Sequence, residues 1–129
     1  MASLNLSTMS KTWIFDLDGT LVEHNGYLKY GRDVLLAGVR EFFDNLPSED
    51  MVVILSARSS QYRELTLDFL ADNRIRFDHI IFDAPKGERI LVNDCKPDGL
   101  KCAYSVNLKR NLFAGLDYIC EDKREGSKI

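Results

Sequence analysis

Short apolar runs alternate along the chain with segments that carry a helical pattern or turn residues. The runs that predict β-strands are Trp13–Phe15, Met51–Leu55, His79–Phe82, Ile90–Val92 and, more weakly, Ala103–Val106. Continuous runs rich in β-branched residues are typical of strands buried on both faces, as in a parallel sheet covered by helices. The pattern therefore predicts parallel strands in the middle of a layered fold.

Two stretches between the runs carry apolar residues at helical spacing. The first stretch ends before Pro47 and contains Leu35, Leu36, Val39, Phe42, Phe43 and Leu46. The second stretch contains Tyr62, Leu65, Phe69 and Leu70. Ser59 or Ser60 is a candidate N-cap for the second helix. Because alternating strands and helices imply right-handed βαβ crossovers, we expect an α/β fold, with a Rossmann-like parallel sheet of about five strands flanked by helices.

The length of 129 residues suits one domain, which we expect over residues 11–120, between loose tails at 1–10 and 121–129. Residues 107–120 have no clear pattern and are expected to form a loop, followed in one interpretation by a short helix. The net charge of −3 gives no general attraction to nucleic acid or to anionic membranes. Because no apolar run is long enough to span a bilayer, we expect neither a nucleic-acid partner nor a membrane partner.

The cysteines and the N-terminal residues bear on the cellular compartment. Cys95, Cys102 and Cys120 lack the paired spacing of a metal site, and reduced thiols are the simplest interpretation. For Cys95, a small side chain that lines the site is favoured over a catalytic thiol. Residues 1–10 do not have the basic and apolar regions of a signal peptide. We therefore expect a cytoplasmic protein.

Two carboxylates directly follow the first apolar run. Asp16 and Asp18 precede Gly19, a turn residue, and so lie where parallel strands place their ligands. Carboxylates this close repel each other unless a cation or a shared proton intervenes, and Mg²⁺ prefers oxygen ligands of this kind. A solvated acidic turn is the alternative interpretation.

Polar residues also follow the second and fourth runs. Ser56, Ala57 and Arg58 come after Met51–Leu55, where a hydroxyl and backbone N–H groups either bind a phosphate or cap a helix. Asp94 follows Ile90–Val92, and Asp98 lies four residues later. For Asp98, a Pro-Asp-Gly turn is an equally good interpretation.

The stretch Asp16-Leu17-Asp18-Gly19-Thr20-Leu21 resembles the first motif of the haloacid dehalogenase-like (HAD) phosphohydrolases, and it matches Asp-x-Asp-Gly-Thr-Leu at every fixed position. This resemblance implies that Asp16 is the nucleophile and that Asp18 is the general acid/base. It implies phosphate binding by Ser56. Ala57 and Gly19 are further candidate substrate-binding residues, and Arg58 is a candidate for binding the substrate phosphate or a polar substrate group. It also implies a Mg²⁺ cofactor whose candidate ligands are Asp16, Asp18, Asp94 and Asp98.

The resemblance also implies a lysine that neutralises the nucleophile and the phosphate. Lys86 lies upstream of the fourth run, as the family pattern requires, and is favoured. Lys96, directly after Asp94 and Cys95, is the competitor and a candidate substrate-binding residue. The chain departs from the family pattern at Asn93, where a Gly usually precedes the metal-binding aspartate.

The gaps between the motifs are too short for a cap domain with its own core, so the chain resembles the small capless type of HAD phosphatase. We expect a Mg²⁺-dependent phosphomonoester hydrolase that forms an aspartyl-phosphate. A loose similarity to small bacterial HAD proteins suggests a sugar phosphate or another polysaccharide-pathway phosphate as substrate. A neighbouring subunit of a homo-oligomer is one way to complete the open site. The alternatives are a phosphotransferase of the same fold and a non-catalytic binding or regulatory module.

Overall fold

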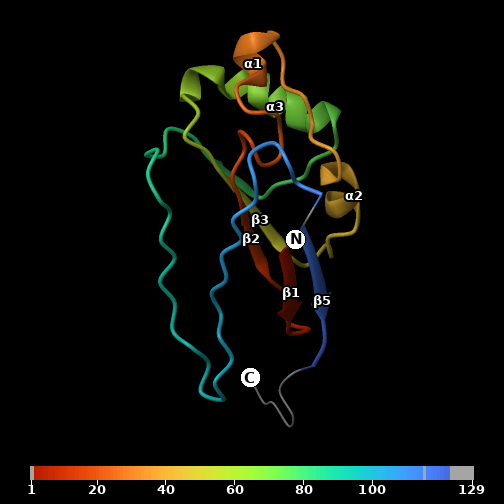
Figure 1. Cartoon of the computed structure of the whole chain (residues 1–129), viewed down its shortest axis with the longest axis vertical. Coiled ribbons are helices and arrows are strands. Elements are labelled where there is room, and N and C mark those ends of the chain that lie inside the picture. Colours follow the sequence, from red (N-terminus) through yellow and green to blue (C-terminus); the bar gives the residue numbers. More distant parts are fainter. Residues whose placement is uncertain (1, 115, 123–129) are drawn as a thin grey trace.

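The computed structural model describes residues 2–114 and 116–122. Within these residues the chain forms an α/β arrangement with two small parallel sheets (Figure 1). The larger sheet contains β2 (Thr12–Phe15), β3 (Met51–Leu55) and β4 (His79–Ile81), in the order β2-β3-β4. The smaller sheet pairs β1 (Ala2–Leu6) with β5 (Leu116–Cys120).

Short helices flank the larger sheet. They are α1 (Gly26–Lys29), α2 (Val39–Asp44), the 3-10 helix η1 (Ser60–Tyr62) and α3 (Arg63–Asp72). Figure 1 shows α1 and α3 together at one end of the molecule, above β2 and β3. The Ser59 side chain accepts a hydrogen bond from the Gln61 N–H and so forms the expected cap. The mixed α/β class and the three strands β2 to β4 are confirmed.

Residues 90–92 and 103–106 are not strands in the structure, although both runs were predicted to be. They belong to a long irregular segment that extends away from the sheet (Figure 1, cyan). The side chains of Ile90 and Val92 are 81% and 84% exposed. An apolar, β-branched run indicates only strand propensity. A β-strand also requires a partner strand with which to form hydrogen bonds. Among the described residues, no strand pairs with these two runs.

The N-terminal residues also differ from expectation. Residues 2–6, predicted as part of a loose tail, form β1 and pair with β5 in parallel register from Ala2↔Leu116 to Leu6↔Cys120. The pairing continues at residue 121, where the Glu121 N–H donates to the Leu6 carbonyl oxygen at 2.9 Å. Of the tail expected over residues 121–129, residues 123–129 lie outside the described residues.

A half-buried aromatic cluster joins the two sheets. The ring of Trp13, on β2, lies 5.0 Å from that of Tyr118, on β5, and 5.4 Å from that of Phe42, on α2. The Trp13 indole N–H donates to the Asp50 carboxylate at 2.9 Å. This packing fixes the position of β2, and with it the turn that follows the carboxyl end of the strand.

The part of the chain that the structure describes contains no helix that is both long and apolar enough to cross a membrane.

Candidate functional site

The turn after β2 presents Asp16 and Asp18 on one side and apolar side chains on the other. Leu17 and Leu21 are 1% and 0% exposed and anchor the turn in the core. The Leu21 N–H donates to the Leu17 carbonyl oxygen, and Gly19 has a φ of 83°. Side chains disfavour this left-handed region, and a Cβ at Gly19 would lie 3.2 Å from Arg110 Cγ. The predicted motif turn is therefore specified by local sequence.

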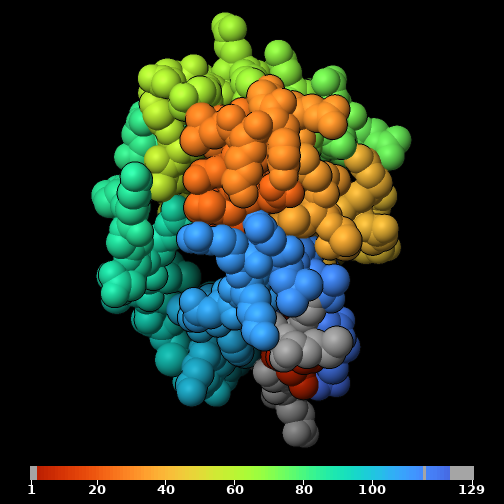
Figure 2. All heavy atoms as spheres, turned by 45° about the horizontal axis from the view of Figure 1, so that its top comes forward, coloured from red at the N-terminus to blue at the C-terminus, as the bar shows by residue number. Residues whose placement is uncertain are grey.

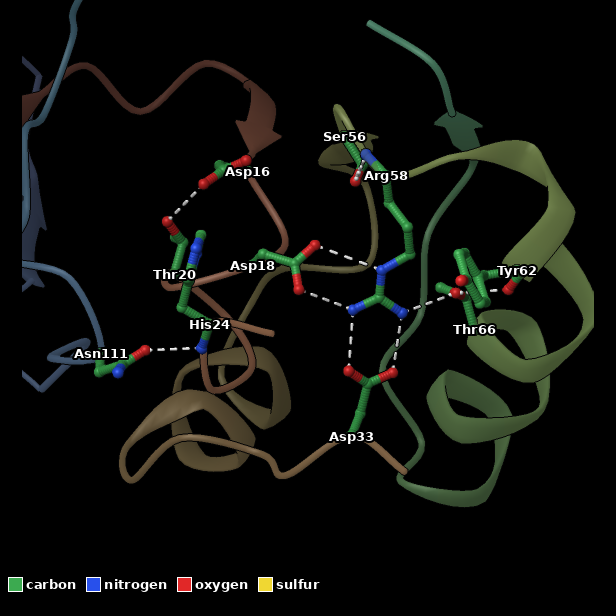
Figure 3. Close-up of polar contacts among 10 residues, drawn as sticks. All are labelled: Asp16, Asp18, Thr20, His24, Asp33, Ser56, Arg58, Tyr62, Thr66 and Asn111. Atoms are coloured by element: carbon green, nitrogen blue, oxygen red, sulfur yellow. Dashed lines mark hydrogen bonds and ion pairs between the residues drawn. The ribbon is translucent and has the colours of Figure 1, made fainter. Parts of the chain in front are cut away.

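Both oxygens of the Asp16 carboxylate are engaged. Thr20 donates its hydroxyl to Oδ2 at 3.0 Å (Figure 3), and Arg89 donates to Oδ1 at 3.0 Å. The Asp16 and Arg89 side chains are 39% and 36% exposed, so solvent screens this ion pair and its net contribution to stability is small, about 0–1 kcal/mol. The contacts orient the carboxylate while leaving it accessible.

The residues after β3 form a tight turn beside the two aspartates. Ser56 is 1% exposed, and its hydroxyl oxygen accepts the Arg58 backbone N–H at 2.9 Å. The Ser56 N–H donates to the Ile81 carbonyl oxygen at 2.8 Å, which fixes the turn against β4. Ala57 is half-buried. The Ser56 hydroxyl oxygen therefore makes a turn contact and not a helix cap, because the next helix, η1, begins at Ser60 and is capped by Ser59, and the Ser56 O–H is left as a donor.

Arg58 is the most extensively bonded side chain of the site. It donates to both Asp18 oxygens at 3.2 and 2.8 Å and to both Asp33 oxygens at 2.9 and 2.8 Å (Figure 3). It also donates to the Thr66 hydroxyl oxygen at 2.8 Å. The Tyr27 ring covers the guanidinium, with Cζ 3.8 Å from the ring centroid.

This cluster is largely removed from solvent. The side chains of Arg58, Asp33 and Asp18 are 0%, 1% and 17% exposed. Burial alone would lower the pKa of Arg58, but the hydrogen bonds that it donates to Asp33 and Asp18, together with their negative charges, outweigh burial and raise the pKa above its usual value. Arg58 therefore stays charged. Removing one partner of a buried pair of this kind costs roughly 3–5 kcal/mol.

The remaining predicted residues lie in the long segment that follows β4. Lys86 and Asp94 are exposed, and Lys96 is half-buried. Asp98 lies in a turn in which the Gly99 N–H donates to the Lys96 carbonyl oxygen and the Leu100 N–H donates to the Asp98 carboxylate. Asp98 therefore lies in a turn, and its role as a metal ligand stays a prediction. Among the described residues, no ion pair links Lys86 or Lys96 to Asp16.

Four residues of the site were not predicted. Asp33 and Arg89 supply the ion pairs described above. Asn111 accepts the His24 backbone N–H at 2.8 Å and donates its own N–H to the Gly19 carbonyl oxygen, which holds residues 108–113 over the motif turn. The buried His24 Nδ1 has no hydrogen-bond partner among the described residues. The sequence offers a signal only for Arg89, the basic residue directly before the run Ile90–Val92.

The flap residues 22–37 cover the cluster from outside. Figure 2 shows this segment (orange) packed between the region near residue 110 (blue) and α3 (green). A groove of about 710 Å³ lies between Arg32–Val34 and α3 and is lined in part by Asp33. Neither Asp16 nor Asp18 lines that groove. Because Asp16 and Asp18 belong to the motif turn and do not line this groove, we place the candidate site at the end of β2.

The site offers carboxylate oxygens that suit a hard cation, but it does not offer a complete set of protein ligands. No group of three or more acidic, histidine or cysteine side chains that could hold a metal is found within residues 2–114 and 116–122. Mg²⁺ usually keeps several waters and binds one or two carboxylates together with substrate phosphates. The accessible Asp16 carboxylate fits a Mg²⁺ that is shared with a phosphate. Both carboxylate oxygens of Asp18 accept hydrogen bonds from Arg58, and ligation by Asp18, Asp94 and Asp98 stays a prediction.

Comparisons with known proteins give one informative likeness. No protein-family model matches the chain, and no curated protein matches it. The fold is similar to a chain in the structure of the Pnkp1/Rnl/Hen1 RNA repair complex, with 32% sequence identity and a TM-score of 0.50. The match covers 65% of this chain and 29% of that chain. It therefore concerns less than a third of the larger protein.

Proposed function

We propose that the chain is a Mg²⁺-dependent phosphomonoester hydrolase of the HAD type, which acts through an aspartyl-phosphate intermediate. The observation that carries this proposal is the pair of oriented carboxylates, Asp16 and Asp18, on a glycine turn at the end of a parallel strand. The complete match of residues 16–21 to the first HAD motif supports it. The finer fold that the resemblance implies, a Rossmann-like sheet of about five strands, remains part of the proposal.

The proposed chemistry divides between the two aspartates. Asp16 attacks the phosphorus atom, and its contacts with Thr20 and Arg89 hold the carboxylate in one orientation. Asp18 protonates the leaving oxygen and then takes a proton from the water that hydrolyses the aspartyl-phosphate. Ser56 offers its hydroxyl to a phosphate oxygen.

The charge of the site supports a cation requirement. Asp16, Asp18 and Asp33 face two guanidinium groups, so the cluster keeps a net negative charge. A phosphate dianion would be repelled from it. Bound Mg²⁺ supplies the positive charge that offsets both the carboxylates and the phosphate.

Two substrate classes follow from different observations. The sequence resemblance favours a sugar phosphate or another polysaccharide-pathway phosphate. The likeness to a chain of an RNA repair complex favours a phosphorylated RNA end as the second candidate. Phosphate release from a panel of sugar phosphates, compared with release from a short RNA carrying a terminal phosphate, separates the two.

The rival activities leave different experimental traces. A phosphotransferase would pass the phosphoryl group to an added alcohol in preference to water. A binding module would release no phosphate from any ester. Release of phosphate from an aryl phosphate by the wild-type protein, dependent on Mg²⁺ and lost in Asp16→Asn, tests the proposal against both rivals.

A further inference from the structure

We propose that Arg58 is a positioning residue that fixes the orientation of Asp18, and that Asp33 holds Arg58 in place for this purpose. This inference rests on the proposed hydrolase function and assigns to Arg58 a role other than phosphate binding. It also assigns a role to Asp33, which lies outside every motif.

The hydrogen bonds of Arg58 exhaust its donors. A guanidinium has five N–H groups in a fixed fork. Nε donates to Asp18, Nη1 donates to Asp33 and Thr66, and Nη2 donates to Asp18 and Asp33. No N–H remains for a phosphate oxygen in this arrangement, and the Arg58 side chain is 0% exposed. A substrate phosphate therefore does not reach the guanidinium.

Asp18, by contrast, keeps capacity for the substrate. A carboxylate accepts about four hydrogen bonds. The Asp18 carboxylate accepts two from Arg58. The Asp18 side chain is 17% exposed, so one side of it reaches solvent. The bidentate contact thus removes rotational freedom from Asp18 without closing it off from a leaving oxygen.

Asp33 and Tyr27 also hold the Arg58 guanidinium in place. Asp33 binds Arg58 in a second bidentate pair, and the Tyr27 ring lies over its face at 3.8 Å. Tyr27 packs edge-on against Tyr62 with ring centroids 4.8 Å apart. The flap and the start of α3 therefore meet at Arg58. Lysine cannot reproduce this arrangement, because a single ammonium cannot bind two carboxylates side by side in a plane.

Leaving-group dependence tests the inference. The rate is measured on p-nitrophenyl phosphate, whose leaving group needs little protonation, and on an alkyl phosphate such as glycerol phosphate, whose leaving group needs a proton. In Asp33→Asn we expect kcat/KM for the alkyl ester to fall roughly tenfold to a hundredfold more than kcat/KM for the aryl ester, because kcat/KM reports the step in which the leaving group departs and not the later hydrolysis of the aspartyl-phosphate, which both esters share. Arg58→Lys is expected to show the same selective loss.

Arg63→Met is the matched control, because Arg63 contacts the Phe82 ring and not the carboxylates; it should leave both rates unchanged. If Asp33→Asn does not fold, Thr66→Val carries the comparison, because it removes one acceptor of Arg58 at a similar side-chain volume. An equal loss on both esters would mean that the cluster is only structural and overturns the inference. A rise in KM on both esters with kcat intact would make Arg58 a phosphate ligand and also overturns it. Absence of any turnover by the wild-type protein instead overturns the hydrolase proposal, and this inference with it.

Discussion

Arg89 donates a hydrogen bond to Asp16 across 73 residues of sequence, at 3.0 Å. This contact brings the beginning of the long irregular segment to the end of β2. It places a cation beside the proposed nucleophile, in the position that the family resemblance gives to a lysine. The finding makes three basic residues, Lys86, Arg89 and Lys96, competitors for one role.

The three competitors can be separated by substitution. We expect Arg89→Met to lower kcat on the order of a hundredfold or more, because a positive charge beside Asp16 offsets charge in the transition state. Lys86→Ala and Lys96→Ala should then be mild. Steady-state kinetics of the three variants on an aryl phosphate measure this. If Lys86→Ala is inactive and Arg89→Met is active, Lys86 has the role that the order of the motifs predicts, and the observed contact of Arg89 with Asp16 does not identify the catalytic cation.

The assignment of the nucleophile is tested by Asp16→Asn. This change keeps the shape of the side chain but removes the attacking charge, so we expect phosphatase activity to fall at least about a thousandfold. The melting temperature should change little, because the lost ion pair with Arg89 is partly exposed. Near wild-type activity, in a sample shown by mass spectrometry to be free of aspartate formed by deamidation of the variant, contradicts the assignment.

The third prediction concerns Asp94 as a ligand of Mg²⁺. Mg²⁺ that binds only the folded state raises the free energy of unfolding by about 2.7 kcal/mol at a hundred times its Kd, and the melting temperature rises with it. If Asp94 is a ligand, Asp94→Ala should remove most of that rise. Glu88→Ala is the control, because Glu88 is an exposed acidic residue of the same segment and is not a candidate ligand. A melting temperature that does not respond to Mg²⁺ in the wild type counts against the site.

The motif turn is the part of the site that the sequence specifies most completely. Gly19 supplies the left-handed backbone, and the buried side chains of Leu17 and Leu21 fix which way Asp16 and Asp18 point. All of these residues are close in sequence, so composition and spacing suffice to predict them. The same holds for the Ser59 cap and for the strand β3.

The contacts that the sequence did not predict join distant segments. Asp33 meets Arg58 across 25 residues and Arg89 meets Asp16 across 73 residues. A charged residue in a loop has many possible partners, and only the folded chain selects one. The strand β1 was not predicted for the same reason: although Ala2–Leu6 alternates apolar and polar residues, its partner β5 is more than a hundred residues away.

The role of β1 leads to a stability prediction. Leu6 is 9% exposed, so Leu6→Ala should lower the free energy of unfolding by about 2–5 kcal/mol. Ser3→Ala, at an exposed position of the same strand, should have almost no effect. Chemical denaturation of both variants measures the difference. Equal free energies of unfolding for the two variants would contradict the packing of β1 and would favour the loose tail that the sequence alone predicts for residues 2–6.

The last prediction concerns stability at acid pH and the carboxyl group of Asp83. Hydrogen bonds from the Ser60 side chain and then from its backbone N–H hold the pKa of Asp83 below its ordinary value of 3.8. A carboxyl group whose pKa is lowered by folding stabilises the folded state above its ordinary pKa, and this contribution is lost as the pH falls through the lowered value. Asp83→Asn should therefore reduce the melting temperature at pH 6 but have a progressively smaller effect from about pH 4 downward.

Asparagine is the appropriate replacement for reasons of backbone conformation. Asp83 has a φ of 63°, in the left-handed region that Asn tolerates better than other side chains with a Cβ. The Asp83 N–H, which donates to the Arg58 carbonyl oxygen at 2.9 Å, is retained in this variant. The measurement is the difference in melting temperature between wild type and variant from pH 6 to pH 3. A difference that stays constant over this range would show that the ionised Asp83 carboxylate contributes nothing to the hold on η1, and that the backbone contact alone fixes the turn beside Arg58.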